Sequence, residues 1–437
     1  MTKRRVKLAR RFNVSPHLWQ RRFVFWGGAV TVGCVASLFS LGSEYANHYF
    51  HKILDVSPNL PLVITPIGLA AVVYMTRKFV PGAQGSGIPQ CIAAISLDTQ
   101  QERNKLLSVR IAIGKVFLTI LSLLAGASVG REGPTVQVGA SIMHSMSRFA
   151  RFSRIELDKG LILAGGASGV AAAFNTPLAG IVFAIEEMSR SFEERTSGTM
   201  ITAVVISGVV SLYFLGNYTY FGHTSVSIPL NASWLSVAVC GCIGGLLGGA
   251  FSRTLVYIST NGLPGVTGKL MRTRPVLFAG LCGLLLACIG LASGNLTYGT
   301  GYQEARGIIE NSGEASQGYG ILKFMATVVS YLSGIPGGIF APSLAIGAGF
   351  GHNLAGLVPY ATPGCVVMLT MVAYFSGVVQ APITAFVIVM EMTDSHTMIL
   401  PLMAASFIAS AVSRKICPKP LYKTMAEGFL GKPKESD

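Results

Sequence analysis

The sequence predicts an all-α membrane protein that crosses the bilayer many times. Of its 437 residues, 51% are hydrophobic and only 12% are charged, whereas soluble domains carry about 25% charged residues. Its 51 glycines are typical of closely packed and interrupted membrane helices. Apolar runs recur along the whole chain, and no stretch between them resembles an interdomain linker.

Basic residues account for the net charge of +15 and predict the topology. Eight Lys/Arg stand in the first 22 residues, and six more lie between Arg414 and Lys434. A nucleic-acid partner would also attract such charge, but both clusters flank apolar segments, as the positive-inside rule describes. We therefore expect an integral membrane protein in contact with the lipid bilayer, with both termini in the cytoplasm and no nucleic-acid partner.

The first apolar run, 23–41, predicts a membrane helix rather than a removed signal. It is too long for a typical signal core and lacks a convincing cleavage site, although Thr-Val-Gly-Cys at 31–34 faintly resembles a lipoprotein site. The eight cysteines are scattered without zinc-like spacing, and the seven histidines form no ligand-like cluster. We expect packing roles for the cysteines, and neither a metal nor a cofactor.

Later apolar runs predict further helices, several of them too short to cross about 30 Å of hydrocarbon alone. Short segments broken by Gly and Pro are tolerated only where protein or a water-filled cavity surrounds them, so they indicate a transporter-like site near the midplane. The expected helices are 23–48, 61–79, 106–126, 135–147, 159–172, 178–188, 197–216, 234–258, 274–293, 320–333, 341–358, 364–378, 383–392 and 399–414.

The two halves of the chain share a pattern that predicts duplication. Each half carries a proline followed by Gly-Ala five and six residues later, and then a second proline with a glutamate nine residues beyond it. The halves are offset by 208 residues at the first proline and by 205 at the second. An odd number of spans per unit would make the repeats antiparallel across the membrane. The matched residues are Pro134 with Pro342, Gly139-Ala140 with Gly347-Ala348, Pro177 with Pro382, and Glu186 with Glu391.

The stretch 130–134 (Gly-Arg-Glu-Gly-Pro) places an ionisable Glu132 in an apolar region where the backbone can open. A charged side chain at bilayer depth costs at least about 2.5–3.5 kcal/mol, so it persists mainly where it lines a polar path. Pro134 suits the first turn of a helix, whose free N–H groups and positive dipole end would point toward Glu132 or toward an anion that replaces it. This predicts an anion site whose occupant can be the protein's own side chain.

The sequence contains no motif for ATP-driven transport or for metal-dependent hydrolysis. No G-x-x-x-x-G-K-[S/T] loop exists, because 265–270 has neither the spacing nor the hydroxyl, and no H-E-x-x-H motif exists. A membrane-embedded enzyme that uses Glu186, Glu187 or Glu391 as general acid or base is an alternative of another class. It lacks a metal cluster and a nucleophile–base pair, so we expect no enzyme.

Three motifs that place Gly and Pro at expected helix starts occur in a fixed order at 85–89, 130–134 and 338–342. Together with the matches listed at the end of this paragraph, they closely resemble the signature of the CLC chloride channel and transporter family. The resemblance covers roughly residues 20–425 and implies a CLC-like fold of two antiparallel repeats with many tilted and broken helices. The further matches are Phe174-Asn175, Pro177-Leu178-Ala179-Gly180, Glu186-Glu187-Met188, Glu391-Met392-Thr393-Asp394 and Lys419-Pro420-Leu421-Tyr422.

The resemblance implies a chloride site built from dipoles. Ser86, beside Gly87, resembles the family's central serine, whose hydroxyl donates to a dehydrated chloride; a helix-capping role is compatible, since a capping hydroxyl can also face an ion. Ile339 and Phe340 resemble the loop whose backbone N–H groups complete the site, and Tyr422 resembles the tyrosine whose phenol closes the inner side. None of these groups carries a full positive charge, so they can both bind and release an anion.

Two glutamates carry the implied coupling to protons. Glu132 resembles the gating glutamate, which occupies the outer anion site when deprotonated and swings away when protonated; a salt bridge with Arg131 is the alternative, although we expect Arg131 to satisfy carbonyls. Glu187 resembles the internal proton-transfer group that exchangers keep and channels replace with an apolar residue. Glu186 remains open as a structural acid or a second proton carrier. The repeat partners Glu391 and Asp394 are expected to be structural.

The resemblance thus implies an antiporter that exchanges chloride for protons, as a homodimer in a bacterial inner (plasma) membrane. An uncoupled, proton-gated chloride channel on the same fold is the closest alternative, and Glu187 argues against it. Ser86 favours chloride over nitrate, and Pro134 argues against the fluoride-exporting branch. After the first motif stand Gln90-Cys91-Ile92 instead of the acidic residues of some exchangers, so we expect a different local route for proton entry. The expected layout is a basic cytoplasmic segment (1–22), a first membrane repeat (23–216), a second membrane repeat (217–416), and a final inner-pore segment with Tyr422 and a short tail (417–437), without CBS domains.

Overall fold

A computed structural model of the chain describes residues 16–150, 155–189, 194–216, 219–222, 224, 226–229, 231–310, 317–358 and 360–430. Most of these residues are helical, and the extended pairings among them are two isolated backbone bridges. Most of the basic segment 1–22, namely 1–15, and the end of the tail, 431–437, lie outside the described residues. The expected all-α class is confirmed.

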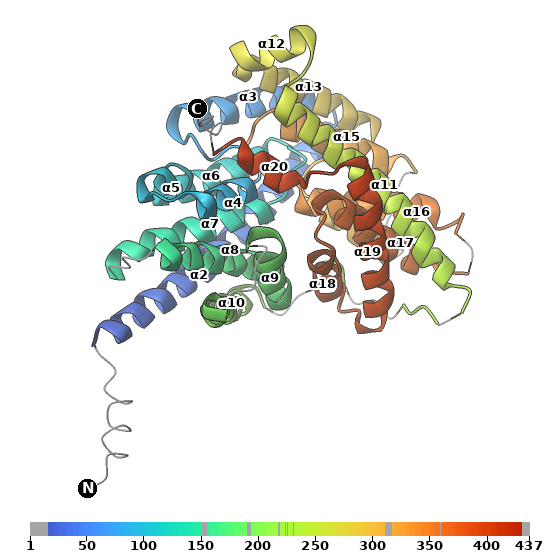
Figure 1. Cartoon of the computed structure of the whole chain (residues 1–437). Helices are drawn as coiled ribbons and strands as arrows, with labels where there is room; N and C mark the ends of the chain where they lie inside the picture. Colours follow the sequence, from blue (N-terminus) through green and yellow to red (C-terminus); the bar gives the residue numbers. More distant parts are fainter. Residues whose placement is uncertain are drawn as a thin grey trace, which may run out of the picture.

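The first half of the chain lies on the left of Figure 1, coloured blue to green, and helices of the second half lie on the right. The first half consists of α2 (Pro16–Val56), α3 (Pro61–Phe79), α4 (Ile88–Ser96), α5 (Gln100–Leu106), α6 (Val109–Leu124), α7 (Glu132–Met146), η1 (Ser147–Ala150), α8 (Ile155–Phe174), α9 (Pro177–Phe183), the π-helical turn η2 (Ala184–Ser189) and α10 (Glu194–Leu215). The second half consists of α11 (Trp234–Asn261), α12 (Gly265–Thr273), α13 (Pro275–Ala292), α14 (Tyr302–Ile309), α15 (Tyr319–Leu332), α16 (Phe340–Leu354), α17 (Pro363–Val379), α18 (Pro382–Thr393), η3 (His396–Met398), α19 (Ile399–Ile416) and α20 (Leu421–Glu427).

Every expected apolar run falls largely on helix, with boundaries that differ by up to eight residues; the run 106–126 is interrupted at 107–108 between α5 and α6, and the run 341–358 extends four residues past the end of α16. Helix α2 extends beyond the expected 23–48 at both ends, and the run 178–188 is divided between α9 and the π-turn η2. The short helices α4, α5, α12, α14 and α20 have seven to nine residues each, too few to show an apolar period of their own. These short helices are the elements that sequence periodicity missed.

Among the described residues, seven helical stretches are long and apolar enough to cross a membrane. Shorter apolar helices such as α17 and α18 are surrounded by protein, which satisfies the condition for broken segments at membrane depth. We call the face at which α2 ends the outer face, and the face at which α2 begins the inner face. The seven stretches are Arg22–Val56, Pro61–Phe79, Gln100–Leu124, Gly198–Leu215, Trp234–Asn261, Pro275–Ala292 and His396–Ile416.

The packing repeats between the halves. Helix α8 packs against α7 and α10 in the first half, as α17 packs against α16 and α19 in the second, while α9 and α18 meet across the middle of the molecule (Figure 1). Two glycines allow α7 and α8 to approach closely, because a Cβ on Gly139 would lie 2.2 Å from the Gly165 carbonyl oxygen. Close glycine-mediated packing is the expected way for membrane helices to associate.

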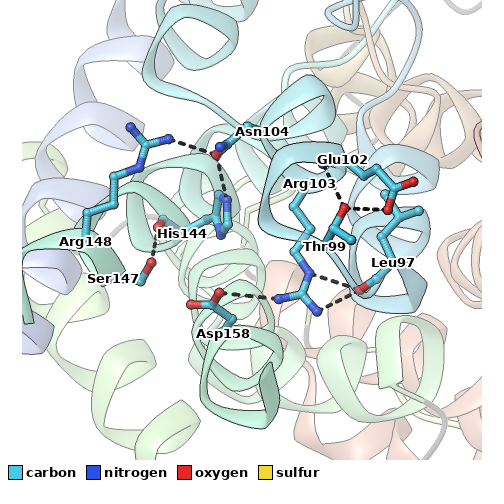
Figure 2. A network of polar contacts seen from close by, with 9 residues as sticks. All are labelled: Leu97, Thr99, Glu102, Arg103, Asn104, His144, Ser147, Arg148 and Asp158. Atoms are coloured by element: carbon cyan, nitrogen blue, oxygen red, sulfur yellow. Dashed lines mark hydrogen bonds and ion pairs between the residues drawn. The ribbon is translucent and has the colours of Figure 1, made fainter. Parts of the chain in front are cut away.

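A polar network anchors α5 to α7, η1 and α8, and thereby holds the C-terminal end of α4 (Figure 2). The buried Arg103 guanidinium donates to the Leu97 carbonyl at 2.7 and 3.1 Å and pairs with Asp158 at 3.3 Å. The Asn104 side-chain oxygen contacts His144 at 3.1 Å and accepts from Arg148 at 2.8 Å. This network fixes the inner end of the short helix whose other end enters the site described next.

Candidate functional site

Backbone hydrogen bonds tie together the three Gly/Pro loops that the sequence singled out. Gly130 and Gly338 each donate to the other's carbonyl oxygen at 2.7 Å. Gly85 donates to the Ile335 carbonyl at 3.1 Å, and Gly337 donates to the Gly85 carbonyl at 3.0 Å. Loops that are far apart in sequence therefore form one unit, and the peptide groups freed by breaking the helices find partners inside the protein.

The N-terminal ends of α4, α7 and α16 meet at this unit. Gly87 caps α4 with φ +102°, and a Cβ there would lie 2.7 Å from the Gln137 Cβ on α7. A Cβ on Gly338, just before α16, would lie 3.1 Å from the Gly133 amide nitrogen on α7. Because helix N-termini carry unpaired N–H groups and a partial positive charge, their convergence favours an anion.

Two buried hydroxyls, those of Ser86 and Tyr422, lie beside this convergence. The Tyr422 phenol, at the start of α20, interacts with the Ser86 hydroxyl, and both side chains are 1% exposed or less. Neither hydroxyl oxygen has another hydrogen-bond partner among the residues that the structure describes. Two hydroxyls that pair with each other use only one of their two O–H groups, so the other stays available to a ligand that accepts hydrogen bonds.

Ile339 and Phe340 form the N-terminal end of α16, and both are buried. The Phe340 ring stacks on Tyr422 with centroids 6.0 Å apart and an interplanar angle of 18°. It also packs edge-on against Phe375 at 4.8 Å. The aromatic cluster holds the Tyr422 ring and the first amides of α16 in fixed positions beside the two hydroxyls.

Glu132 begins α7, and its carboxylate folds back over the Gly130 backbone. A Cβ on Gly130 would lie 2.3 Å from one carboxylate oxygen. The other oxygen accepts a hydrogen bond from the Tyr302 hydroxyl at 2.7 Å. The backbone amides of Glu132 itself and of Ala341 on α16 face this carboxylate, so two helix starts act on one acidic group.

Arg131, next to the acid, has a different set of contacts. Its guanidinium donates to the Ser40 carbonyl at 2.6 Å, to the Glu44 carboxylate at 3.0 Å and to the Tyr220 hydroxyl. Binding to a carbonyl agrees with the structural role expected from the sequence, while the ion pair with Glu44 on α2 was not predicted.

The adjacent acids Glu186 and Glu187 have different partners, which distinguishes their roles. Both Glu186 oxygens accept backbone N–H groups at the start of α18, from Ile383 at 3.1 Å and Thr384 at 2.7 Å. Glu187 is 3% exposed and lies within electrostatic reach of the Tyr422 phenol. Glu186 is therefore a helix cap, and Glu187 is the acid of this pair that acts electrostatically on the Tyr422 phenol.

Glu391, the repeat partner of Glu186, makes the mirror-image contact. Its oxygens accept the backbone N–H groups of Leu178 at 3.2 Å and Ala179 at 2.8 Å, at the start of α9. Each repeat thus caps a helix of the other with an acid at the same repeat position. The structural role expected for Glu391 agrees with this contact.

Two buried lysines, which the sequence motifs did not identify, bind backbone carbonyls near the site. The Lys115 ammonium donates to the carbonyls of Ala83 at 2.8 Å and Gly85 at 2.6 Å. Lys323, which stands 208 residues later, donates to the carbonyls of Thr297 and Gly299, both at 2.9 Å. The offset equals that of the Gly/Pro motifs, so a repeat comparison of the buried lysines is the signal that would have revealed them.

The lysine contacts also reveal a further repeat pair, Gly85-Ser86-Gly87 and Gly299-Thr300-Gly301. The flanking glycines adopt the same left-handed backbone, with φ +64° and +102° in the first triplet and +64° and +82° in the second. The first triplet begins α4, and the second begins α14. The sequence signal was a shared Gly-hydroxyl-Gly triplet 214 residues apart.

The chain is similar to known proteins over most of its length. The family model described as voltage gated chloride channel matches residues 67–414. The solved structure of a slow cyanobacterial Cl⁻/H⁺ antiporter is 26% identical, with a TM-score of 0.79 over 94% of this chain and 99% of that chain.

Two more solved structures are similar in fold. One is a CLC-type fluoride/proton antiporter, 23% identical with a TM-score of 0.78, covering 92% of this chain and 96% of that chain. The other is a eukaryotic CLC transporter, 22% identical with a TM-score of 0.75, covering 94% of this chain and 74% of that chain. The expected fold of two antiparallel repeats with broken helices is confirmed.

The reciprocal caps generate a stability prediction. Glu391→Ala leaves the Leu178 and Ala179 amides without their acceptor, so we expect a loss of about 1–2 kcal/mol in the free energy of unfolding. Glu186→Ala should cost a similar amount, because it removes the mirror-image contact. Thermal unfolding of the purified protein in detergent measures both. The control is Glu427→Ala, which removes an exposed acid at the end of α20; equal midpoints for all three variants would contradict the capping role.

Proposed function

Because the chain belongs to the voltage gated chloride channel family, we propose that it exchanges chloride for protons across a membrane. The observation that carries this proposal is the position of two acids around one pair of hydroxyls. Glu132 and Glu187 both lie within electrostatic reach of the Tyr422 phenol, which interacts with Ser86. A site that holds an anion between two titratable groups can couple anion movement to proton movement.

Chloride would be held by neutral donors in this mechanism. The hydroxyls of Ser86 and Tyr422 donate to the ion, and the amides at Ile339 and Phe340, with Gly87 at the start of α4, add their dipoles. The dipoles are fixed by the backbone pairing and the aromatic cluster, so they need little reorganisation when the ion enters. Since no formal cation holds the ion, it can also leave.

Glu132 would act as the gate and as the outer proton acceptor. Its carboxylate, when ionised, lies at the meeting point of α7 and α16 and occupies the place of an anion. Protonation removes the negative charge and with it the attraction to the two helix starts. The neutral side chain then leaves, and chloride takes its place beside the same amides.

Glu187 would pass protons between the inner side and the site. Glu186 is engaged as a helix cap, which favours Glu187 for the proton role. At the position where some exchangers carry an acid, the Gln90 side chain instead donates to the carbonyls of Gln84 at 2.7 Å and Gly82 at 3.3 Å. Protons would therefore reach Glu187 by a route that does not use residue 90.

Family membership also supports proposals about the transport mode, the oligomeric state and the membrane in which the protein acts. The slow cyanobacterial relative is a Cl⁻/H⁺ antiporter, which favours exchange over an uncoupled channel on the same fold. We infer a homodimer in a bacterial inner membrane with both termini in the cytoplasm, organised as the segments 1–22, 23–216, 217–416 and 417–437. Pro134 and Ser86 favour chloride over fluoride and nitrate as the transported anion.

Coupling is tested by the reversal potential of the purified protein in liposomes. We expect a chloride gradient to drive protons uphill, and a reversal potential that ignores pH would indicate the uncoupled channel instead. Glu132→Gln should abolish proton coupling and keep chloride flux, because an amide cannot carry the proton. Glu187→Ala should stop proton movement and spare chloride flux, whereas the matched Glu186→Ala should stay coupled. Coupling lost in Glu186→Ala but kept in Glu187→Ala would reverse their roles.

The chloride site is tested separately by Gly133→Ala. Gly133 lies in α7, and a Cβ there would lie 2.3 Å from the Ser86 hydroxyl oxygen, which must move. A hydrogen bond to a charged group is worth about 1.5–3 kcal/mol, so chloride affinity should fall about tenfold or more. Isothermal titration with chloride measures the affinity. Gly27→Ala is the control, since its Cβ would meet no atom within 4 Å; equal affinities in the two variants would place chloride away from Ser86.

A further inference from the structure

An open cavity of about 470 Å³ lies on the outer side of the molecule and ends near Glu132. Helix α2 contributes Glu44, His48 and His51 to its wall, the loop before α14 contributes Thr300, and α14 itself contributes Tyr302. Glu132 is absent from this wall and is 1% exposed. A barrier of side chains therefore separates the cavity from the acid.

Two stacked tyrosines form this barrier. The rings of Tyr220 and Tyr302 lie 4.6 Å apart with an interplanar angle of 28°, and both line the cavity. Tyr302 donates its O–H to Glu132 at 2.7 Å. Tyr220 accepts from Arg131 and donates to the Ala173 carbonyl at 2.9 Å, so its own hydroxyl is held by other groups.

The repeat explains how Tyr302 reaches this position. Helix α14 begins with the same left-handed glycine pattern as α4, and a buried lysine fixes the loop before each helix. On the inner side this element delivers the Ser86 hydroxyl, with Ile88 as the first residue of α4. On the outer side the residue that matches Ile88 is Tyr302, and its hydroxyl meets the acid.

We propose that Tyr302 is a positioning residue that holds the ionised Glu132 in the path and closes the path toward the outer cavity. This inference rests on the proposed role of Glu132 as the gate. The O–H donor stabilises the carboxylate and loses its acceptor when the side chain takes up a proton and leaves. The hydrogen bond thereby sets the external proton concentration at which the gate opens.

Other groups around Glu132 also contribute to its charge balance. Arg131 is the neighbouring cation, and it is paired with Glu44. Tyr422 on α20 lies within electrostatic reach of the acid, and Tyr220 stacks on Tyr302. Removing only the Tyr302 hydroxyl leaves these groups and the ring stack in place.

Tyr302→Phe tests the proposal through the pH profile of chloride flux in liposomes. Loss of the donor makes protonation of Glu132 easier, so half-maximal flux should move to higher external pH by about one unit or more, a tenfold lower proton concentration. The control is Tyr298→Phe, which removes a buried hydroxyl from the same loop that donates to the Ala287 carbonyl. Its midpoint should stay that of the parent protein.

A double variant separates this inference from the proposed function. In the Glu132→Gln background, Tyr302→Phe should leave the pH profile unchanged, because the Gln amide does not take up a proton and Tyr302 then has no carboxylate to stabilise. An unshifted midpoint in the single Tyr302→Phe variant overturns the positioning role, and so does a shift shared with Tyr298→Phe or kept in the double variant. If Glu132→Gln itself remains fully coupled, the proposed gate fails and this inference fails with it.

Discussion

The reciprocal backbone pair between Gly130 and Gly338 is the contact on which the rest of the structure depends. Two helices, α7 and α16, begin in the middle of the fold, where hydrocarbon surroundings would leave their freed peptide groups unsatisfied. The two glycines stand at equivalent repeat positions, and each donates to the other at 2.7 Å. Such an isologous contact forms across a two-fold axis. The axis that relates the repeats therefore passes beside the proposed ion path. The same two hydrogen bonds also hold the first amides of α7 and α16 beside that path.

Charged side chains inside the fold also bind backbone groups that broken helices leave without partners. Glu186 and Glu391 each cap a helix of the opposite repeat, so neither half can complete its helix starts alone. Lys115 and Lys323 each bind the carbonyls of a loop that precedes a short helix. A lone buried charge would be strongly destabilising, but a charge with several backbone partners stabilises an irregular loop instead. Ionisable residues inside this fold are thus mainly structural, and Glu132 and Glu187 stand out against that background.

Local chemistry explains how far the sequence predicted the structure. Gly and Pro act on their own backbone, so the expected starts at 135 and 341 lie close to the observed starts of α7 and α16. Helices α4 and α14 have nine and eight residues, too few to show an apolar period, so the start of α4 was expected only from its Gly/Pro motif and α14 was missed. The partner of Tyr302 stands 170 residues away in sequence, and the partners of Glu186 almost 200. No local rule predicts such contacts, which depend on how the two repeats dock.

The repeats are equivalent in backbone and unequal in side chains, and this inequality gives the proposed path a direction. Glu132 begins α7, whereas Phe340 begins α16 at the same repeat position, 208 residues later. Phe340 stacks on Tyr422, and its side chain carries no titratable group. A symmetric site would carry an acid at both helix starts or at neither. With one acid, protonation changes the attraction for anions at one end only, and the proposed mechanism therefore assigns the inner proton step to Glu187.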